Sequence, residues 1–369
     1  MQFIDLKSQY AQLKERIDAR IQQVLDHGQY IMGPEVAEFE SALADYAGVD
    51  HVVSCGNGTD AIQLSLMAAG IGPGDVVITT PFTFYATVEA IMLVGARPVF
   101  ADVDPHSFNL CPDALESAIS SAQSEYGEKL KAVLVVDIFG LCADYSRIEP
   151  LCEAAGVLLI EDAAQSIGAE QGGRKAGSFG AIATASFFPA KPLGCYGDGG
   201  AVLTDNAELA ELLGSLRVHG KGANKYDNVR VGTNSRLDTL QAAVLLEKLA
   251  VFDEELSQRE AVAERYRNGL SADLIPQAIP DTARSSYAQF SLRAADREAR
   301  IAALKEKNIP VQVYYPVPLH LQPALAQFGH QAGEFPVAEQ LAEEMMSLPM
   351  HPYLDAGAQD AVLAALATE

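Results

Sequence analysis

Lys191 lies alone between aromatic residues and a glycine-rich turn. Residues 184–200 read TASFFPAKPLGCYGDGG, and no other charge lies between Lys175 and Asp198. Burial disfavours the ammonium form, so a lysine in apolar surroundings loses proton affinity. A neutral amine can form a Schiff base with an aldehyde. Most lysines are solvated surface charges, but the aromatic and glycine context favours a reactive lysine here.

Two adjacent carboxylates end an apolar run at residues 157–166, VLLIEDAAQS. In open α/β sheets, ligands bind beyond the carboxyl ends of the strands. An acid there could bind a metal, pair with a cationic ring nitrogen or cap a helix. Because side chains alternate along a strand, we expect Glu161 and Asp162 to point to opposite faces, so only one of them need face a ligand.

A third motif, SCGNGTDA at residues 54–61, joins a predicted strand to a predicted helix. Its glycines allow a tight turn, and free N–H groups at a helix start form an anion site. Thr59 could add a hydroxyl. The alternative is a plain helix start in which Thr59 or Asp60 is the N-cap.

The three motifs together fit one ligand, pyridoxal 5′-phosphate (PLP). Its phosphate would sit at the helix start, its ring nitrogen against an acid, and its aldehyde at the lysine. A carboxylate beside the ring nitrogen keeps that nitrogen protonated, which makes the ring an electron sink. The sequence therefore predicts a PLP site.

The composition excludes several other classes of protein. Among 369 residues, 49 acidic and 26 basic side chains give a net charge of −23. Such a surface repels nucleic acid and anionic membranes. The five scattered cysteines show no zinc spacing, which predicts no metal site and reduced thiols in the cytoplasm. The charged, amphipathic N-terminus is not a signal peptide.

Short apolar runs alternate with helical stretches through the first two thirds of the chain. The runs are continuous and rich in β-branched residues, which is typical of strands buried on both faces. We therefore predict an α/β fold with a mainly parallel, seven-stranded sheet. The expected strands are residues 51–55, 76–80, 98–103, 132–139, 157–161, 183–188 and 201–204, and the expected helices include residues 11–27, 60–69, 112–121 and 145–155.

The character of the chain changes after Asn234. Residues 237–269 predict one or two long helices, followed by a strand near 287–293 and a short helix at 299–307. We predict a large PLP-binding α/β domain at residues 1–250, with the N-terminal helix, and a small α+β domain at residues 251–369.

These motifs resemble the fold-type I, PLP-dependent nucleotide-sugar aminotransferases of the DegT/DnrJ/EryC1/StrS family. The resemblance runs from residues 3–6 to residues 347–351. Its most specific pieces are EDAAQ at 161–165, SFFPAK at 186–191 and NSRL at 234–237. It implies a homodimer with shared active sites.

The resemblance also implies a role for each matched residue. Lys191 would bind the cofactor covalently and carry the proton between cofactor and substrate carbons. The other cofactor contacts would be Asp162 at the ring nitrogen, Gln165 at the ring oxygen, Gly58, Thr59 and Ser186 at the phosphate, Tyr85 over the ring and Asn234 at the neighbouring subunit's phosphate. Arg236 would lie in the substrate pocket. Tyr85 could instead be core packing, and Tyr314 and His320 either contact substrate or shape their proline-rich loop.

The implied reaction moves the amino group of L-glutamate to a keto group of a nucleotide-linked sugar, for surface polysaccharide. Residues 187–200 and 230–241 are most similar to family members that act on UDP-2-acetamido-2-deoxy-3-keto-glucuronate. A hexuronate carboxylate needs a cation, which Arg236 could supply in a bidentate pair. The alternatives are a 3-keto or 4-keto 6-deoxysugar linked to UDP or dTDP, a PLP enzyme of elimination or racemisation, and a non-catalytic regulator that kept the fold.

Overall fold

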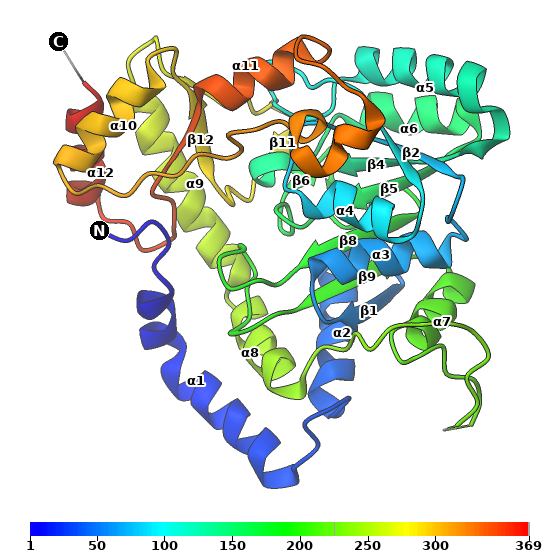
Figure 1. Cartoon of the computed structure of the whole chain (residues 1–369). Helices are drawn as coiled ribbons and strands as arrows, with labels where there is room; N and C mark the ends of the chain where they lie inside the picture. Colours follow the sequence, from blue (N-terminus) through cyan, green and yellow to red (C-terminus); the bar gives the residue numbers. More distant parts are fainter. Residues whose placement is uncertain (225, 368–369) are drawn as a thin grey trace.

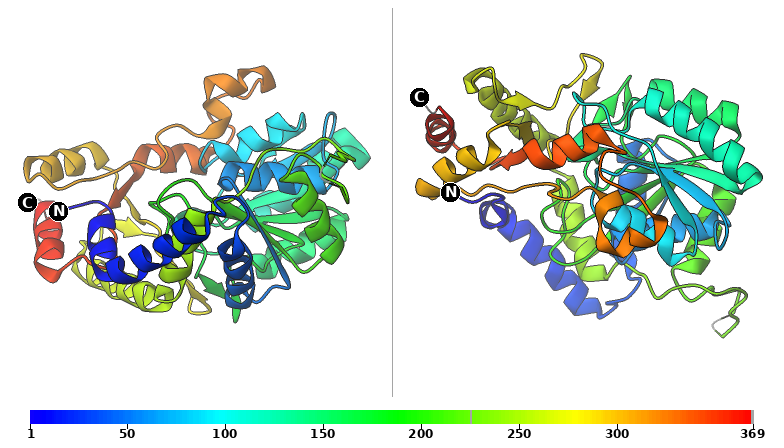
Figure 2. Two further views of the ribbon diagram at one scale, coloured as in Figure 1. Left: turned by 90° about the horizontal axis from the view of Figure 1, so that it is seen from below. Right: turned by 45° about the horizontal axis from the view of Figure 1, so that its top comes forward.

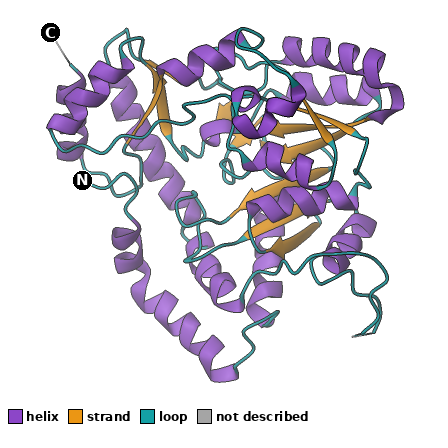
Figure 3. Ribbon diagram, in the orientation of Figure 1, coloured by secondary structure: helices purple, strands orange, loops and turns teal. Residues whose placement is uncertain are grey.

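A seven-stranded sheet forms the centre of the molecule in the computed structural model, which describes residues 1–224 and 226–367. Helices cover both of its faces (Figures 1 and 3). The strand order is β1-β9-β8-β5-β4-β2-β3. The strands are β1 (His51–Cys55), β2 (Val76–Thr79), β3 (Arg97–Phe100), β4 (Leu130–Val136), β5 (Leu158–Asp162), β8 (Ile182–Ser186) and β9 (Gly200–Thr204).

Each of the seven predicted runs contributes one strand to this sheet, so the predicted α/β class is confirmed. The pairs β3–β2, β2–β4, β4–β5 and β5–β8 are parallel, whereas β9 runs antiparallel to both β1 and β8. All residues of β2 and β9 are buried. Continuous apolar strands form here because helices exclude water from both faces.

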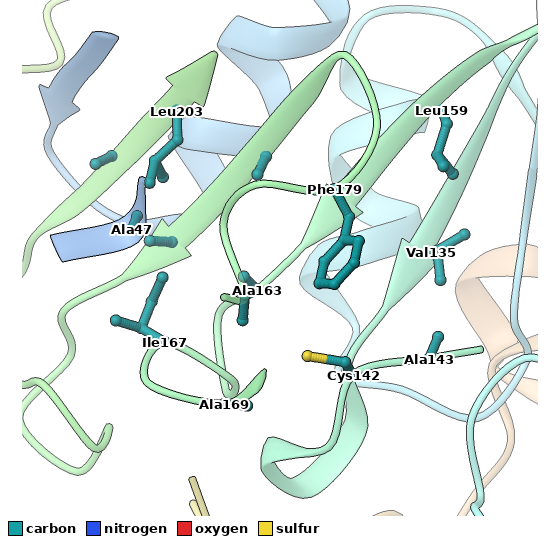
Figure 4. Close-up of a cluster of buried hydrophobic side chains, with 14 of the residues drawn as sticks. Ala47, Val135, Cys142, Ala143, Leu159, Ala163, Ile167, Ala169, Phe179 and Leu203 are labelled. Carbon is teal, nitrogen blue, oxygen red and sulfur yellow. The ribbon is translucent and has the colours of Figure 1, made fainter. Parts of the chain in front are cut away.

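The two faces of the sheet carry different helices. On one face, α3 (Gly58–Ala68) and α4 (Ala86–Leu93) cover Leu134 and Ile160, and α7 (Ala207–Leu216) lies farther along. On the other face, α2 (Pro34–Ala47), α5 (Pro112–Tyr126), α6 (Tyr145–Ala155) and α8 (Thr239–Leu249) bury Val135 and Leu159. Figure 4 shows part of this second face, where Phe179 covers the strands. Each fully buried Leu or Ile stabilises the fold by about 2 kcal/mol.

The N-terminal helix α1 (Leu6–His27) extends along one side of the molecule (Figures 1 and 2). Its buried Leu13 and Ile17 pack against Val244 of α8. Met350 N donates to Phe3 O over 3.1 Å, so the start of the chain contacts its C-terminal part. No helix within residues 1–224 and 226–367 is long and apolar enough to cross a membrane.

A second buried cluster forms beyond residue 260, around Tyr266, Leu292 and Met346. The elements of the C-terminal part are α9 (Phe252–Gly269), β10 (Ile275–Pro276), β11 (Ala283–Arg284), β12 (Phe290–Arg293), α10 (Arg297–Glu306), α11 (Pro336–Glu344), β13 (Met345–Leu348) and α12 (Ala356–Leu366). Strands β10, β12 and β13 form one small sheet, and β11 pairs with the hairpin of β6 (Glu170–Gln171) and β7 (Arg174–Lys175) in another.

The predicted long helical region is two helices, α8 and α9, with a break at residues 250–251. The predicted strand and short helix correspond to β12 and α10. Helix α9 gives Phe252 and Leu256 to the large core and Val262 and Tyr266 to the second cluster. The domain boundary at residue 250 therefore stays a prediction, and residues 368–369 of the predicted second domain lie outside the described residues.

Candidate active site

The predicted site residues gather at the carboxyl edge of the central sheet. Asp162 ends β5 and Ser186 ends the neighbouring strand β8, which runs parallel to it. Lys191 follows five residues after β8. Parallel strands bring their carboxyl ends to one edge, where ligands of open α/β sheets bind.

The turn after β1 is built to accept an anion. Gly58 and Thr59 are the first two residues of α3, so their N–H groups have no acceptor within the helix. A Cβ at Gly58 would lie 2.8 Å from the Ser186 Cβ, so only glycine lets the turn approach Ser186 this closely. The N-cap is Asn57, whose side chain accepts from Asp60 N over 2.8 Å. The alternative assignment of Thr59 or Asp60 as the cap is wrong, because both lie within the helix.

Lys191 has a free amine. Burial lowers its pKa to about 8, and the nearby Asp162 carboxylate partly opposes that shift. Among the described residues, the amine has no hydrogen bond and no ion pair within 4 Å. Such an amine is partly neutral near neutral pH, which is the state that attacks an aldehyde.

Asp162 faces the α4 side of the sheet, as the alternation along β5 predicts. Thr87 Oγ1 of α4 and Ala164 N each lie 3.2 Å from its carboxylate as donors. Burial raises the pKa of Asp162, whereas the Ala164 N–H, Lys191 and Thr87 lower it. Glu161 faces the other side and accepts from Gly177 N and Phe179 N. The prediction that the two acids point to opposite faces of the sheet is therefore confirmed.

Gln165 is buried, and both ends of its amide are engaged. Oε1 accepts from Phe139 N over 2.7 Å, and Nε2 donates to Tyr315 Oη over 3.0 Å. Thr87 and Tyr315 could not be predicted as site residues from the sequence. Their hydroxyl groups lie 75 and 150 residues from the partners they contact, and no local pattern marks such distant pairs.

The segment 234–236 lies beside the turn after β1. Ser235 Oγ accepts from Gly56 N over 2.9 Å and donates to Asp60 over 2.6 Å. This contact places Arg236, which is half-buried, next to the predicted phosphate site, while Asn234 is exposed. Tyr85 is half-buried at the start of α4 and packs against the cluster of Val88 and Leu319.

Tyr314 and His320 differ in their surroundings. Tyr314 is half-buried, with its ring 5.7 Å from that of Tyr315, which contacts Gln165. The His320 ring is buried; its Nε2 lies 3.1 Å from Glu339 Oε1, and its Nδ1 has no partner among the described residues. A substrate contact remains a prediction for both residues.

The profile of the DegT/DnrJ/EryC1/StrS aminotransferase family matches residues 11–367. The chain belongs to this family. It is 47% identical to the UDP-2-acetamido-2-deoxy-3-oxo-D-glucuronate aminotransferase of Pseudomonas aeruginosa, over 99% of both chains. It is 43% identical to a pleiotropic regulatory protein of Geobacillus stearothermophilus, over 99% of this chain and 97% of that one. A crystal structure of a family aminotransferase from Brucella abortus superimposes with a TM-score of 0.96 at 49% identity, covering 99% and 98%.

The protein is therefore a nucleotide-sugar aminotransferase of this family, and its cofactor is PLP. A putative sugar aminotransferase from Streptococcus pneumoniae, 25% identical, has been solved in PLP and pyridoxamine phosphate forms, both with a TM-score of 0.89. The described residues fit this cofactor: a free amine on the half-buried Lys191, a buried acid at Asp162 and a glycine cradle at Gly58 against Ser186. In residues 1–224 and 226–367 no cluster of His, Cys, Asp and Glu could hold a metal ion.

Proposed function

We propose that this aminotransferase moves the amino group of L-glutamate to the 3-keto group of UDP-2-acetamido-2-deoxy-3-keto-glucuronate, in the cytoplasm, for surface polysaccharide. The observation that carries the choice of sugar is the unpaired guanidinium of Arg236. A uronate differs from most sugars by its carboxylate, and burying that charge requires a cation. The 47% identity to an enzyme of that name supports the same choice.

Arg236 is unusual among the arginines of this acidic protein. In the described chain, each of the others makes an ion pair, a hydrogen bond or a contact with an aromatic ring. Arg236 makes none of these. With 49 acidic residues in the chain, a half-buried arginine without a carboxylate partner indicates a position kept for an acidic ligand.

The chain's own residues divide the chemistry between them. Bound PLP supplies the electron sink that lets a proton leave carbon. Lys191, whose amine is partly neutral near pH 8, would hold that proton and deliver it to the other carbon. Asp162 would keep the ring nitrogen protonated, and Gln165, fixed at both ends of its amide, would orient the ring oxygen. The N–H groups of Gly58 and Thr59 would hold the phosphate.

We also propose that two copies form the active unit. Asn234 is exposed and directly precedes Ser235, which accepts from Gly56 N of the phosphate turn, so its side chain is available to a second copy. Large apolar side chains are exposed at Val231, Phe188 and Phe84, which lie close in the chain to Asn234, Lys191 and Tyr85. Exposed apolar surface of this kind is typical of protein interaction sites. Sedimentation of the purified holoenzyme tests this, because a monomer that turns over at full rate contradicts it.

The test of the sugar is the Arg236→Ala variant, assayed with glutamate and two sugars, the UDP-linked keto-uronate and its analogue without the carboxylate. A hydrogen bond to a charged group is worth about 1.5–3 kcal/mol. We therefore expect kcat/KM for the uronate to fall about 10- to 100-fold, and for the analogue by less than about threefold. Arg230→Ala is the matched control, since Arg230 lies in the same segment and contacts Ser215.

Each alternative gives a different result in this assay. An equal loss with both sugars, or full activity of the wild type on a keto 6-deoxysugar alone, favours the 6-deoxysugar aminotransferase. A protein that stays colourless with PLP and forms no 2-oxoglutarate favours the regulatory alternative. Bleaching of a yellow holoenzyme by glutamate, with 2-oxoglutarate formed in step with aminated sugar, excludes elimination or racemisation.

A further inference from the structure

A buried arginine holds the strand end that leads into the phosphate turn, residues 56–59. Arg217 follows α7, which lies beside β1 (Figure 1). Its Nη1 donates to Ser54 O over 2.7 Å and to Glu40 Oε1 over 2.5 Å. Glu40 Oε1 also accepts from Ser54 N and Ser54 Oγ, over 2.9 and 2.7 Å. One ion pair therefore fixes the main chain two residues before the turn begins.

A buried serine holds the turn itself. Ser235 Oγ accepts from Gly56 N over 2.9 Å and donates to Asp60 Oδ2 over 2.6 Å. A Cβ at Gly56 would lie 3.2 Å from this hydroxyl oxygen, so the turn packs directly on Ser235. Gly58 and Thr59 lie between the two residues that Ser235 contacts. The hydroxyl therefore brackets the two N–H groups that face the predicted phosphate.

The main chain of Arg217 joins these two anchors. Ser235 N donates to Arg217 O over 3.0 Å, and the next residue, Val218, pairs with Asn234 in an antiparallel bridge. The side chain of Arg217 thus holds the entry to the turn, while its carbonyl holds the serine that brackets the turn. Both anchors belong to one pair of adjacent segments, and both side chains are buried.

We propose that Arg217 and Ser235 are positioning residues that set the affinity of the turn for the cofactor phosphate. This inference rests on the proposed function, in which Gly58 N and Thr59 N hold that phosphate. Main-chain N–H groups bind an anion most tightly when they are aimed before it arrives. The bond from Ser235 also holds the carboxylate of Asp60, a negative charge at the same helix start that would otherwise be free to approach and repel the phosphate.

The test compares two ligands of the apoenzyme, pyridoxamine 5′-phosphate and pyridoxamine, by isothermal titration calorimetry. Neither has an aldehyde, so the bond to Lys191 does not contribute. The ratio of their dissociation constants measures what the phosphate adds. A hydrogen bond to a charged group changes affinity by about 10- to 100-fold. We therefore expect a ratio of at least about 100 in wild type.

Both substitutions should lower this ratio. We expect a loss of at least about tenfold in Arg217→Met and about fivefold in Ser235→Ala, with the affinity for pyridoxamine changed by less than about twofold. Because a single nitrogen of Arg217 makes both of the bonds described, a lysine ammonium can replace it. Arg217→Lys should therefore keep the ratio within about threefold of wild type.

The matched control is Arg300→Met. Like Arg217, Arg300 is 8% exposed, and it bonds to carboxylates, those of Asp273 and Asp296, and to a carbonyl, that of Leu366. It lies in the C-terminal part of the chain. Breaking a buried ion pair lowers stability, so both arginine variants should melt at lower temperature, but only Arg217→Met should lose the preference for phosphate.

The outcomes separate this inference from the proposed function. A wild-type ratio near one contradicts the phosphate turn, and the positioning roles fall with it. A high wild-type ratio that neither variant lowers, or an equal loss of affinity for both ligands, overturns the positioning roles and leaves the turn in place. If Arg217→Met fails to fold, Ser235→Ala, which loses one hydroxyl group, decides the question.

Discussion

Two lysines of this protein, the half-buried Lys191 and the buried Lys248, have nearly the same proton affinity and very different surroundings. Burial lowers the pKa of Lys191 and of Lys248 to about 8. Lys248, on α8, donates to Gly194 O over 2.5 Å, and its amine lies 4.4 Å from the centre of the Tyr196 ring. Lys191 has no partner among the described residues. Burial alone therefore does not make a lysine reactive; its amine must also be left free.

The two lysines are connected through the loop that follows Lys191. Helix α8 fixes the loop that follows Lys191, because Lys248 holds Gly194 and Gln241 Oε1 accepts from Tyr196 N over 2.8 Å. Lys248 also lies near Glu255 of α9, which accepts from Gln9 of α1. One lysine thus anchors the loop to the helices, and the loop presents the other lysine to the cofactor site.

The largest difference between the two lysines should appear when Lys191→Ala is compared with Lys248→Met. Removing the lysine that binds the cofactor and carries the proton should lower the rate of 2-oxoglutarate formation from glutamate by at least about 10⁴-fold. The melting temperature of the apoenzyme should change by less than about 2 °C, because the amine has no bond to lose. Lys248→Met, which removes a buried lysine without touching the chemistry, should keep activity within about tenfold.

A Lys191→Ala variant that turns over at a substantial fraction of the wild-type rate contradicts the role of this amine. Equal losses in both variants would mean that burial, and not freedom from partners, distinguishes the reactive lysine.

The pH dependence of cofactor uptake should also differ between the two lysines, with a smaller effect. Only the neutral amine attacks an aldehyde, and the pKa of Lys191 is about 8. The rate at which apoenzyme acquires the lysine-bound, coloured cofactor should therefore fall about tenfold per pH unit below about pH 8. Stopped-flow absorbance between about pH 6 and pH 9 measures it, with Lys248→Met as the control that keeps the midpoint. A rate independent of pH over this range contradicts a shifted Lys191.

The sequence predicted Lys191 because its signal is local: one charge among aromatic residues and glycines. No sequence pattern predicted that Lys248 is buried, because it lies in an ordinary helical pattern 54 residues from the carbonyl it contacts. The same contrast applies to Asp162, which ends a recognisable strand, and to Tyr315, whose contact with Gln165 joins residues 150 positions apart. A reactive residue in a local motif can be predicted from the sequence. A buried polar contact cannot, because it depends on which distant elements pack together.

The strands of the fold show the same difference between local patterns and distant contacts. The seven central strands were predictable because most of them are continuous apolar runs rich in β-branched residues. Strand β13 was not predictable, because its four residues MMSL carry no β-branched side chain and its partner β12 lies about 50 residues earlier. Its strand form depends on tertiary packing against β12, which overrides local propensity.

A small effect is expected on the free energy of unfolding. Its change with pH measures what the buried amine of Lys248 contributes. An unfolded lysine titrates near pH 10.4, and Lys248 in the folded protein near 8. Between these values the folded state binds fewer protons than the unfolded state, so the free energy of unfolding rises with pH, by about 1.4 kcal/mol per unit. Lys248→Met lacks this rise.

At about pH 7 the variant should lie within about 1 kcal/mol of wild type, because it loses the bond to Gly194 O and also avoids burying a charge. By about pH 10 the wild type should be more stable by about 2–3 kcal/mol. Denaturant titrations of both proteins at the two pH values measure the difference, in which the other titrating groups cancel. A difference that does not grow with pH would mean that Lys248 stays charged when buried, held by Glu255 and the Tyr196 ring. The two lysines would then differ in charge as well as in partners, and the reactivity of Lys191 would follow from its lost proton.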